Sequence, residues 1–149
     1  MKLAEALQER AALIKRINGL SERLEDNLFA EADTEPAEAP EALLEELNGC
    51  SERLEELVVR INMTNANLKV GLETMTALLA RRDVMRKKLS VWQNMLSNGR
   101  GSRYFHRSEV RLVRTFDVPE MQKRVDRLAR EMRELDATIQ QANWNNDLI

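Results

Sequence analysis

The residues with the greatest potential for chemistry lie around the single histidine of the chain. His106 stands near Ser108 and Glu109, a grouping that superficially resembles acid-base or nucleophilic sites. A catalytic triad requires a fixed geometry, however, and proximity within a predicted loop does not supply it. We therefore expect a surface or interface role for these three residues, and we assign no catalytic residue.

Five arginines in the same stretch form a second candidate site. They are Arg100, Arg103, Arg107, Arg111 and Arg114, with Tyr104, Phe105 and Phe116 among them. Such a pattern could contact phosphates and stack bases of a nucleic acid. The alternative, which we favour, is a set of interface ion pairs to the acidic second helix.

Nucleotide and metal sites lack their usual ligands in this sequence. There is no Gly-rich phosphate loop, no cysteine pair with zinc spacing and no second histidine. We expect no cofactor, no metal ion and a non-enzymatic protein. Because Cys50 is the only cysteine, no intrachain disulfide can form, and a cytoplasmic location fits best. We expect neither a signal peptide nor a transmembrane helix, since no apolar run is long enough.

Charge is distributed unevenly along the chain. Charged residues reach 32% and aromatic residues only 4%, a composition typical of long packed helices. Residues 22–56 carry thirteen acids against two arginines, a net charge of −11, whereas residues 57–149 have a net charge of +7. This asymmetry indicates either acidic and basic helical faces that meet within or between subunits, which we favour, or a nucleic-acid surface.

Apolar residues recur with alternating spacings of three and four in four segments, which predicts four helices with one apolar seam each. The expected helices span residues 3–28, 41–62, 75–97 and 119–143, and an acidic loop spans residues 30–40. Pro40 favours the start of the second helix. Thr74 and Asp117 can cap the third and fourth helices.

Two short segments, residues 68–72 and 110–116, show strand-like alternation, and we expect them to pair as a two-stranded ribbon. The predicted fold is therefore mainly α, a single helical domain over residues 1–149. Two long antiparallel helical hairpins would form a four-helix bundle or a coiled-coil-like structure, with a short two-stranded β ribbon.

Several residues are candidates for an interface between subunits. Arg10 and Arg82 fall on apolar seams, where a charge must find a partner or solvent. The apolar stripe of the first helix is widened by Leu7, Ile14 and Leu28, so we expect another subunit to cover it. The complete set of candidate interface residues is Arg10, Arg82, Trp92, Arg107, Arg111, Arg114 and Trp144.

The chain resembles, over essentially its full length, a family of small bacterial helical proteins often labelled septicolysin. The resemblance rests on residues 1–7, 60–62, 64–65, 79–83, 108–110, 113–115 and 141–144. The family name implies a membrane-lytic toxin. The resemblance implies no catalytic residues, because the family has no established ones.

The leading hypothesis is a non-enzymatic cytoplasmic protein that forms a homo-oligomer through its seams and acts as a structural or interaction module for a protein partner. A membrane-lytic toxin of the septicolysin type is the second hypothesis. A nucleic-acid-binding protein that uses the patch from Arg100 to Arg114 is the third. Membranes and nucleic acids are thus the less favoured partners.

Overall fold

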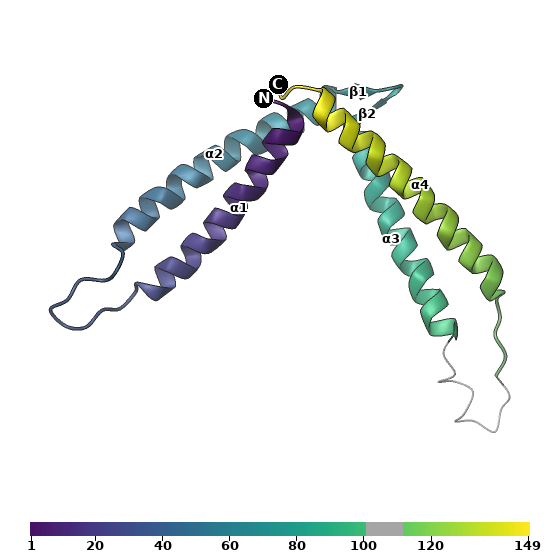
Figure 1. The fold of residues 1–149 in the computed structure, drawn as a ribbon, viewed down its shortest axis with the longest axis horizontal. Coiled ribbons are helices and arrows are strands. Elements are labelled where there is room, and N and C mark those ends of the chain that lie inside the picture. The colour runs from purple at the N-terminus through teal and green to yellow at the C-terminus, as the bar shows by residue number, and fades with distance from the viewer. Residues whose placement is uncertain (101–111) are drawn as a thin grey trace. The chain divides into compact units, whose positions relative to one another are not determined.

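The structure is a computed structural model that describes residues 1–100 and 112–149. Within these residues the chain is mainly α-helical, with four helices and one two-stranded antiparallel ribbon, as the sequence predicts (Figure 1). The elements in chain order are α1 (Leu3–Asp26), α2 (Pro40–Asn67), β1 (Lys69–Val70), β2 (Glu73–Thr74), α3 (Met75–Arg100) and α4 (Val118–Asn145). The predicted helices correspond to these four in order.

The end of α2 differs most from its predicted position. The sequence predicts an end near residue 62, because residues 61–72 contain three asparagines and have low helix propensity. The helix instead continues to Asn67, and Thr64 is only 2% exposed. The contacts of the buried side chains of Ile61 and Thr64 therefore override the weak intrinsic propensity of this part of the helix.

Contacts divide the chain into two compact units, whereas the sequence predicts one domain. The first unit comprises residues 1–68 and 142–149, and the second comprises residues 69–141. Each unit contains a pair of helices with its own apolar core, and each is described by itself below.

The first unit is built on an antiparallel hairpin of α1 and α2, the arrangement predicted from their seams. Near the connecting loop the core contains Leu20, Leu43 and Cys50, and Cys50 is 7% exposed, as expected for a small core residue on the seam. At the opposite end of the hairpin lies a second cluster. Its buried residues are Leu3, Ala6, Leu57, Ile61 and Leu148.

The last residues of the chain complete this second cluster. Lys2 and Asp147 form an isolated antiparallel bridge, and the Leu148 amide donates to the Met1 carbonyl at 2.9 Å. The Ile149 amide donates to the hydroxyl oxygen of Thr64 at 3.0 Å. The C-terminal segment therefore joins the start of α1 to the end of α2, a contact that its Asn-rich sequence does not predict.

The ribbon exists, but the predicted pairing of its strands is wrong. β1 pairs with β2 in the register Lys69↔Thr74 and Val70↔Glu73, with a two-residue turn between them. Residues 112–116 form no strand, and residues 110 and 111 lie outside the described part of the chain. Gly71 has a φ of +65°, which glycine adopts without strain, so a tight turn closes locally. A short loop costs less entropy than pairing with a segment forty residues away.

The second unit is built on α3 and α4, which run antiparallel. Its core consists of Leu89 and Leu96 from α3 with Met121, Val125 and Leu128 from α4. Both predicted caps are present: the Ala77 amide donates to the Thr74 hydroxyl at 3.2 Å, and the Glu120 amide donates to the Asp117 carboxylate at 2.9 Å.

Gly99 has a packing role that differs from the turn predicted for it. The sequence Asn98-Gly99 predicts that the third helix stops at residue 97, yet α3 continues to Arg100. A Cβ atom at position 99 would overlap the ring of Phe116, which packs against the same core. Glycine therefore allows the close approach of the Phe116 ring here, and a larger residue would require that ring to move.

We expect Thr64→Val to loosen the C-terminal segment, because it leaves the Ile149 amide without its acceptor. The loss should lower the free energy of unfolding by about 1–3 kcal/mol. Amide hydrogen exchange at Ile149 should accelerate in Thr64→Val and stay slow in Thr64→Ser, which keeps the hydroxyl. Equal exchange rates in both variants would contradict this role.

Candidate interaction surfaces

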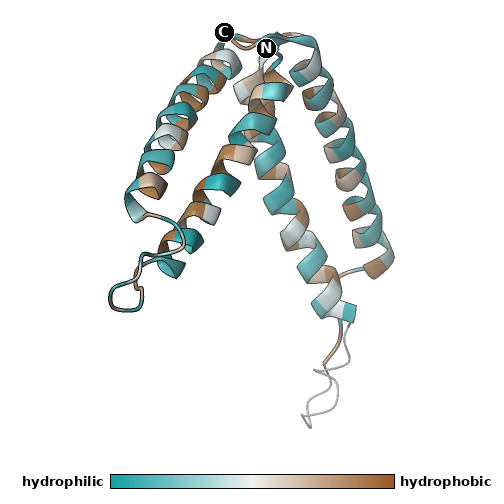
Figure 2. Cartoon of the chain, turned by 60° about the vertical axis from the view of Figure 1, so that its left-hand side comes forward, coloured by the Kyte–Doolittle hydropathy of each residue, from teal (hydrophilic) through white to brown (hydrophobic). Residues whose placement is uncertain are grey.

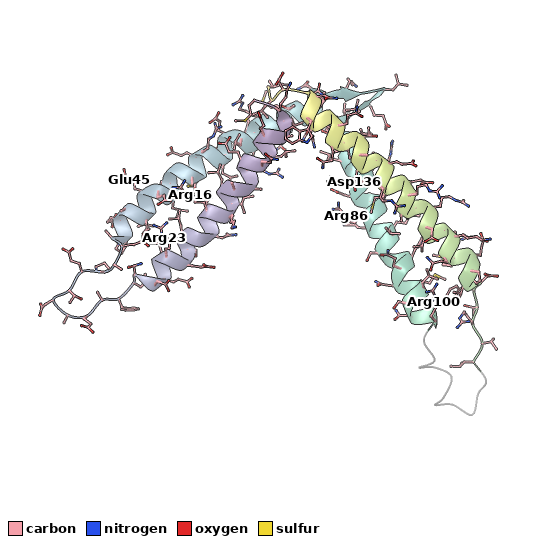
Figure 3. All side chains as sticks on the ribbon, viewed as in Figure 1. Arg16, Arg23, Glu45, Arg86, Arg100 and Asp136 are labelled. Atoms are coloured by element: carbon pink, nitrogen blue, oxygen red, sulfur yellow. The ribbon has the colours of Figure 1, made fainter. Side chains whose placement is uncertain are left out.

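One edge of the α1–α2 hairpin is lined by ion pairs. Arg53 donates through Nε and Nη2 to the two carboxylate oxygens of Glu9, at 2.7 and 3.0 Å. Arg16 Nε donates to Glu46 at 2.7 Å. In the heptads whose a and d positions form the seam, all four residues occupy g positions. We call them, together with Arg23, the charged edge; Figure 3 labels Arg16 and Arg23 on α1.

Hydrogen bonds between guanidinium and carboxylate groups favour the charged forms of the side chains along the charged edge. The hydrogen bond from Arg53 holds the pKa of Glu9 below its ordinary value, and that of Glu56 is lowered by the same guanidinium. The pKa values of Arg16 and Arg53 are raised in turn by their bonds to carboxylates. These side chains are about one-third exposed or more in most cases, so each pair contributes little to stability. The pairs form only in this register of the two helices, which they therefore favour weakly.

The opposite edge of the same hairpin is apolar. Positions e and g flank the seam on opposite sides, so with charges at g the e residues lie on the other edge. The apolar residues at e are Leu7 and Ile14 on α1 and Leu44 and Val58 on α2, which we call the apolar edge. Leu7 is partly buried against the core, but Ile14, Leu44 and Val58 are 44%, 41% and 37% exposed. Figure 2 shows hydrophobic residues alternating with hydrophilic ones along the helices.

The second unit carries a cleft beside Trp92, between α3 and α4. The ammonium of Lys88 lies 4.6 Å from the centre of the Trp92 ring, a cation–π contact. The cleft has a volume of ≈ 210 Å³. Its lining residues are Lys88, Trp92, Arg124, Arg127, Leu128 and Glu131, and we call it the Trp92 cleft.

The two seam arginines have different environments. Arg82 pairs with Asp83 at 3.2 Å and reaches Asp136 of α4 at 3.9 Å, so its charge is compensated within its own hairpin. Arg10 is half-buried, and within the described residues it makes no ion pair. Of the two, only Arg10 remains a candidate for an ion pair with another subunit.

The predicted arginine patch is only partly described. Arg114 donates to the Gly99 carbonyl at 2.7 Å, and Arg100 donates to Gln122 at 2.6 Å. Arg107 and Arg111 lie outside the described residues, as do His106, Ser108 and Glu109. Arg114, in the segment between α3 and α4, thus bonds to the end of α3 and not to the acidic second helix.

The remaining predicted residues are the two tryptophans. Trp92 is partly buried against the core of the second unit and lines the cleft described above. Trp144 is 51% exposed in the first unit. Both remain predicted interface residues.

Within residues 1–100 and 112–149, no group of three or more His, Cys, Asp or Glu residues is placed to hold a metal ion. The helices of the same residues include none with a length and apolarity sufficient to cross a membrane.

Comparisons with known proteins place the chain in a family. The model of a family of unknown function, DUF6847, matches residues 10–148. The chain belongs to this family. A crystal structure described as that of a functionally unknown conserved protein from Corynebacterium diphtheriae is 34% identical, with a TM-score of 0.93, and the match covers 100% of this chain and 99% of that one. No curated protein matches the chain.

The DUF6847 match includes α2, α3, α4 and the part of α1 from Arg10 onward. Of the residues of the two edges and the Trp92 cleft, it leaves out Leu7 and Glu9. Most of these surfaces therefore lie within the matched part of the chain.

The Glu9–Arg53 pair predicts a pH-dependent contribution to stability. Because the pKa of folded Glu9 lies below the ordinary value of 4.5, its contribution is complete above that pH and is lost as the pH falls through the folded pKa. We expect Glu9→Gln to lower the melting temperature most near pH 7, and the difference from the unmodified protein to disappear in strong acid.

Thermal unfolding followed by circular dichroism from pH 7 to pH 2 measures this difference. Glu22→Gln is the matched control, because it removes an exposed carboxylate from the same helix but no ion pair of the charged edge. A difference between Glu9→Gln and the unmodified protein that stayed constant over the whole range would contradict the role of the ion pair.

Proposed function

We propose that this protein is a non-enzymatic helical module that self-associates through the apolar edge of its α1–α2 hairpin and presents the assembly to protein partners. The observation that carries the proposal is the division of one hairpin into a charged edge and an apolar edge. Ion pairs occupy the first, and Leu7, Ile14, Leu44 and Val58 occupy the second.

A hairpin that stood alone would need only its a and d seam to be apolar. Additional apolar residues at e widen the stripe, as in helices that pack against more than one neighbour. Burial of each of these partly exposed side chains against another helix would contribute roughly 1 kcal/mol. The apolar edge is therefore better explained by a further helical surface packed on it than by the hairpin alone.

A second copy of the same edge supplies such a surface. In a two-fold interface the same patch is used by both subunits, so an apolar edge can pack on itself. Two further e positions on this edge hold small, exposed residues. Ser21 lies one heptad after Ile14 on α1, and Ser51 lies between Leu44 and Val58 on α2. Two hairpins packed in this way would form a four-helix bundle between copies.

We place the protein in the cytoplasm, because its only cysteine is a buried thiol on the α2 seam. A reducing compartment keeps such a thiol unmodified. The other two functions suggested by the sequence gain no comparable support. Arg100 and Arg114 are bonded to neighbouring groups of the second unit, and nothing in the described residues is specific to membrane lysis.

Substitution of the apolar edge should separate the subunits. Val58→Glu and Ile14→Glu place a charge where the second copy would pack, which opposes burial. Size-exclusion chromatography with light scattering should show a multimer for the unmodified protein and monomers for both variants at the same concentration.

Val59→Glu is the matched control for Val58→Glu. Val59 is the next residue along α2 and is 51% exposed, but it occupies an f position on the face away from the seam. It should leave the assembly unchanged. A monomeric unmodified protein would refute the proposed function, and equal effects of Val58→Glu and Val59→Glu would show that the apolar edge is not the contact.

A further inference from the structure

The loop between α1 and α2 holds an aromatic side chain out in solvent among acids. Phe29 is 91% exposed and the preceding Leu28 is 61% exposed. Four acids surround them without an ion pair in the described residues: Asp26, Glu31, Asp33 and Glu35. An exposed aromatic residue of this kind is costly in water and is a typical anchor of a protein interface.

The base of this loop is fixed by buried polar contacts. Asn27 is 9% exposed; its side chain donates to the Arg23 carbonyl at 2.8 Å and accepts from the Glu38 amide at 2.9 Å. Arg23 also pairs with the Glu38 carboxylate. These bonds join the end of α1 to the segment just before α2, so both ends of the loop that carries Phe29 are held together. Fixed ends reduce the entropy that the loop can lose when it binds.

The Trp92 cleft has the complementary chemistry. Lys88, Arg124 and Arg127 give it three positive charges against the single negative charge of Glu131. Within the described residues, these three cations make no ion pair. Trp92 and Leu128 supply an apolar wall between the charges.

We propose that the Trp92 cleft binds the acidic loop of a second copy of this chain, with Phe29 as the anchor against Trp92 and with Glu31 and Asp33 facing the cations. The inference rests on the proposed self-association and identifies a second contact within it. Two copies related by a two-fold axis would each offer one loop and one cleft, so the contact can be reciprocal.

The dimensions of the cleft favour a side chain over a small molecule. Its volume of ≈ 210 Å³ is below the roughly 300–1,000 Å³ of typical small-molecule pockets. Its Glu131 carboxylate would repel a continuous phosphate backbone, which makes a nucleic acid the weaker candidate. An aromatic anchor flanked by separate carboxylates satisfies both the apolar wall and the cations around it.

The first experiment compares two double substitutions with the same change in net charge. Arg124→Glu/Arg127→Glu removes two cations of the cleft, whereas Arg130→Glu/Arg133→Glu changes two exposed arginines of the same helix that do not line it. Sedimentation equilibrium should show association weakened by about tenfold or more in the first variant and nearly unchanged in the second. Phe29→Ala should weaken it similarly.

The second experiment mixes a copy with a disabled cleft and a copy with a disabled loop. The first carries Arg124→Glu/Arg127→Glu, and the second carries Phe29→Ala, Glu31→Gln and Asp33→Asn under a different affinity tag. Each alone should associate weakly. The mixture retains one intact loop and one intact cleft, so the two copies should copurify more strongly than two differently tagged copies of either variant, which keep only the apolar edge. Copurification no stronger than that of either variant with itself would refute a loop–cleft contact between copies.

The outcomes separate this inference from the proposed function. If all cleft and loop variants associate normally while Ile14→Glu is monomeric, the loop–cleft contact is refuted and the apolar edge stands. A monomeric unmodified protein refutes both. Equal weakening by the cleft and control double substitutions indicates long-range charge effects and refutes the cleft. Binding of a labelled single-stranded oligonucleotide that Arg124→Glu/Arg127→Glu abolishes, with association unchanged, assigns the cleft to nucleic acid instead.

Discussion

The antiparallel register of α1 against α2 is the constraint on which the surfaces of the first unit depend. Sliding one helix along the other would separate Glu9 from Arg53 and Arg16 from Glu46 while it disrupted the buried seam. Because these charges occupy g positions, the apolar e residues can lie only on the opposite edge. The buried seam thus fixes the register, and the weak surface ion pairs are consistent with the same register although they contribute little to its energy.

Local signals in the sequence predicted the helices. Contacts between residues far apart in the sequence could not be predicted. Thr74 and Asp117 act as caps because a cap involves only the next few residues. The bridge between Lys2 and Asp147 depends on chain ends that meet only after folding. The pairing of the ribbon was wrong for a different reason: alternation predicted a strand at residues 68–72, but the tight turn at Gly71 pairs residues 69–70 with the adjacent residues 73–74 rather than with a distant segment.

The candidate surfaces were only partly predictable for a related reason. The wide stripe of the first helix, with Leu7 and Ile14, is visible in the sequence and indicated a covered face. Its counterpart on α2 required assignment of full heptads, which would have found Leu44 and Val58 at e. The Trp92 cleft could not be predicted, because Lys88 and Arg124 are brought together only by the packing of α3 on α4. Charge counting favoured a contact between acidic and basic surfaces over a nucleic-acid surface, but it could not name the side chains of such a contact.

The position of the apolar edge allows assembly and folding to be separated experimentally. Seam residues such as Leu20 and Leu57 are fully buried within one chain, so their truncation would remove packing from the monomer itself. Three of the four residues of the apolar edge are already more than one-third exposed, so a polar replacement there takes little from the isolated hairpin. A variant of the apolar edge that dissociates without losing helicity therefore reports on the contact between copies. Phe29 allows assembly and folding to be separated at the loop in the same way, because its side chain is 91% exposed and packs little against its own chain.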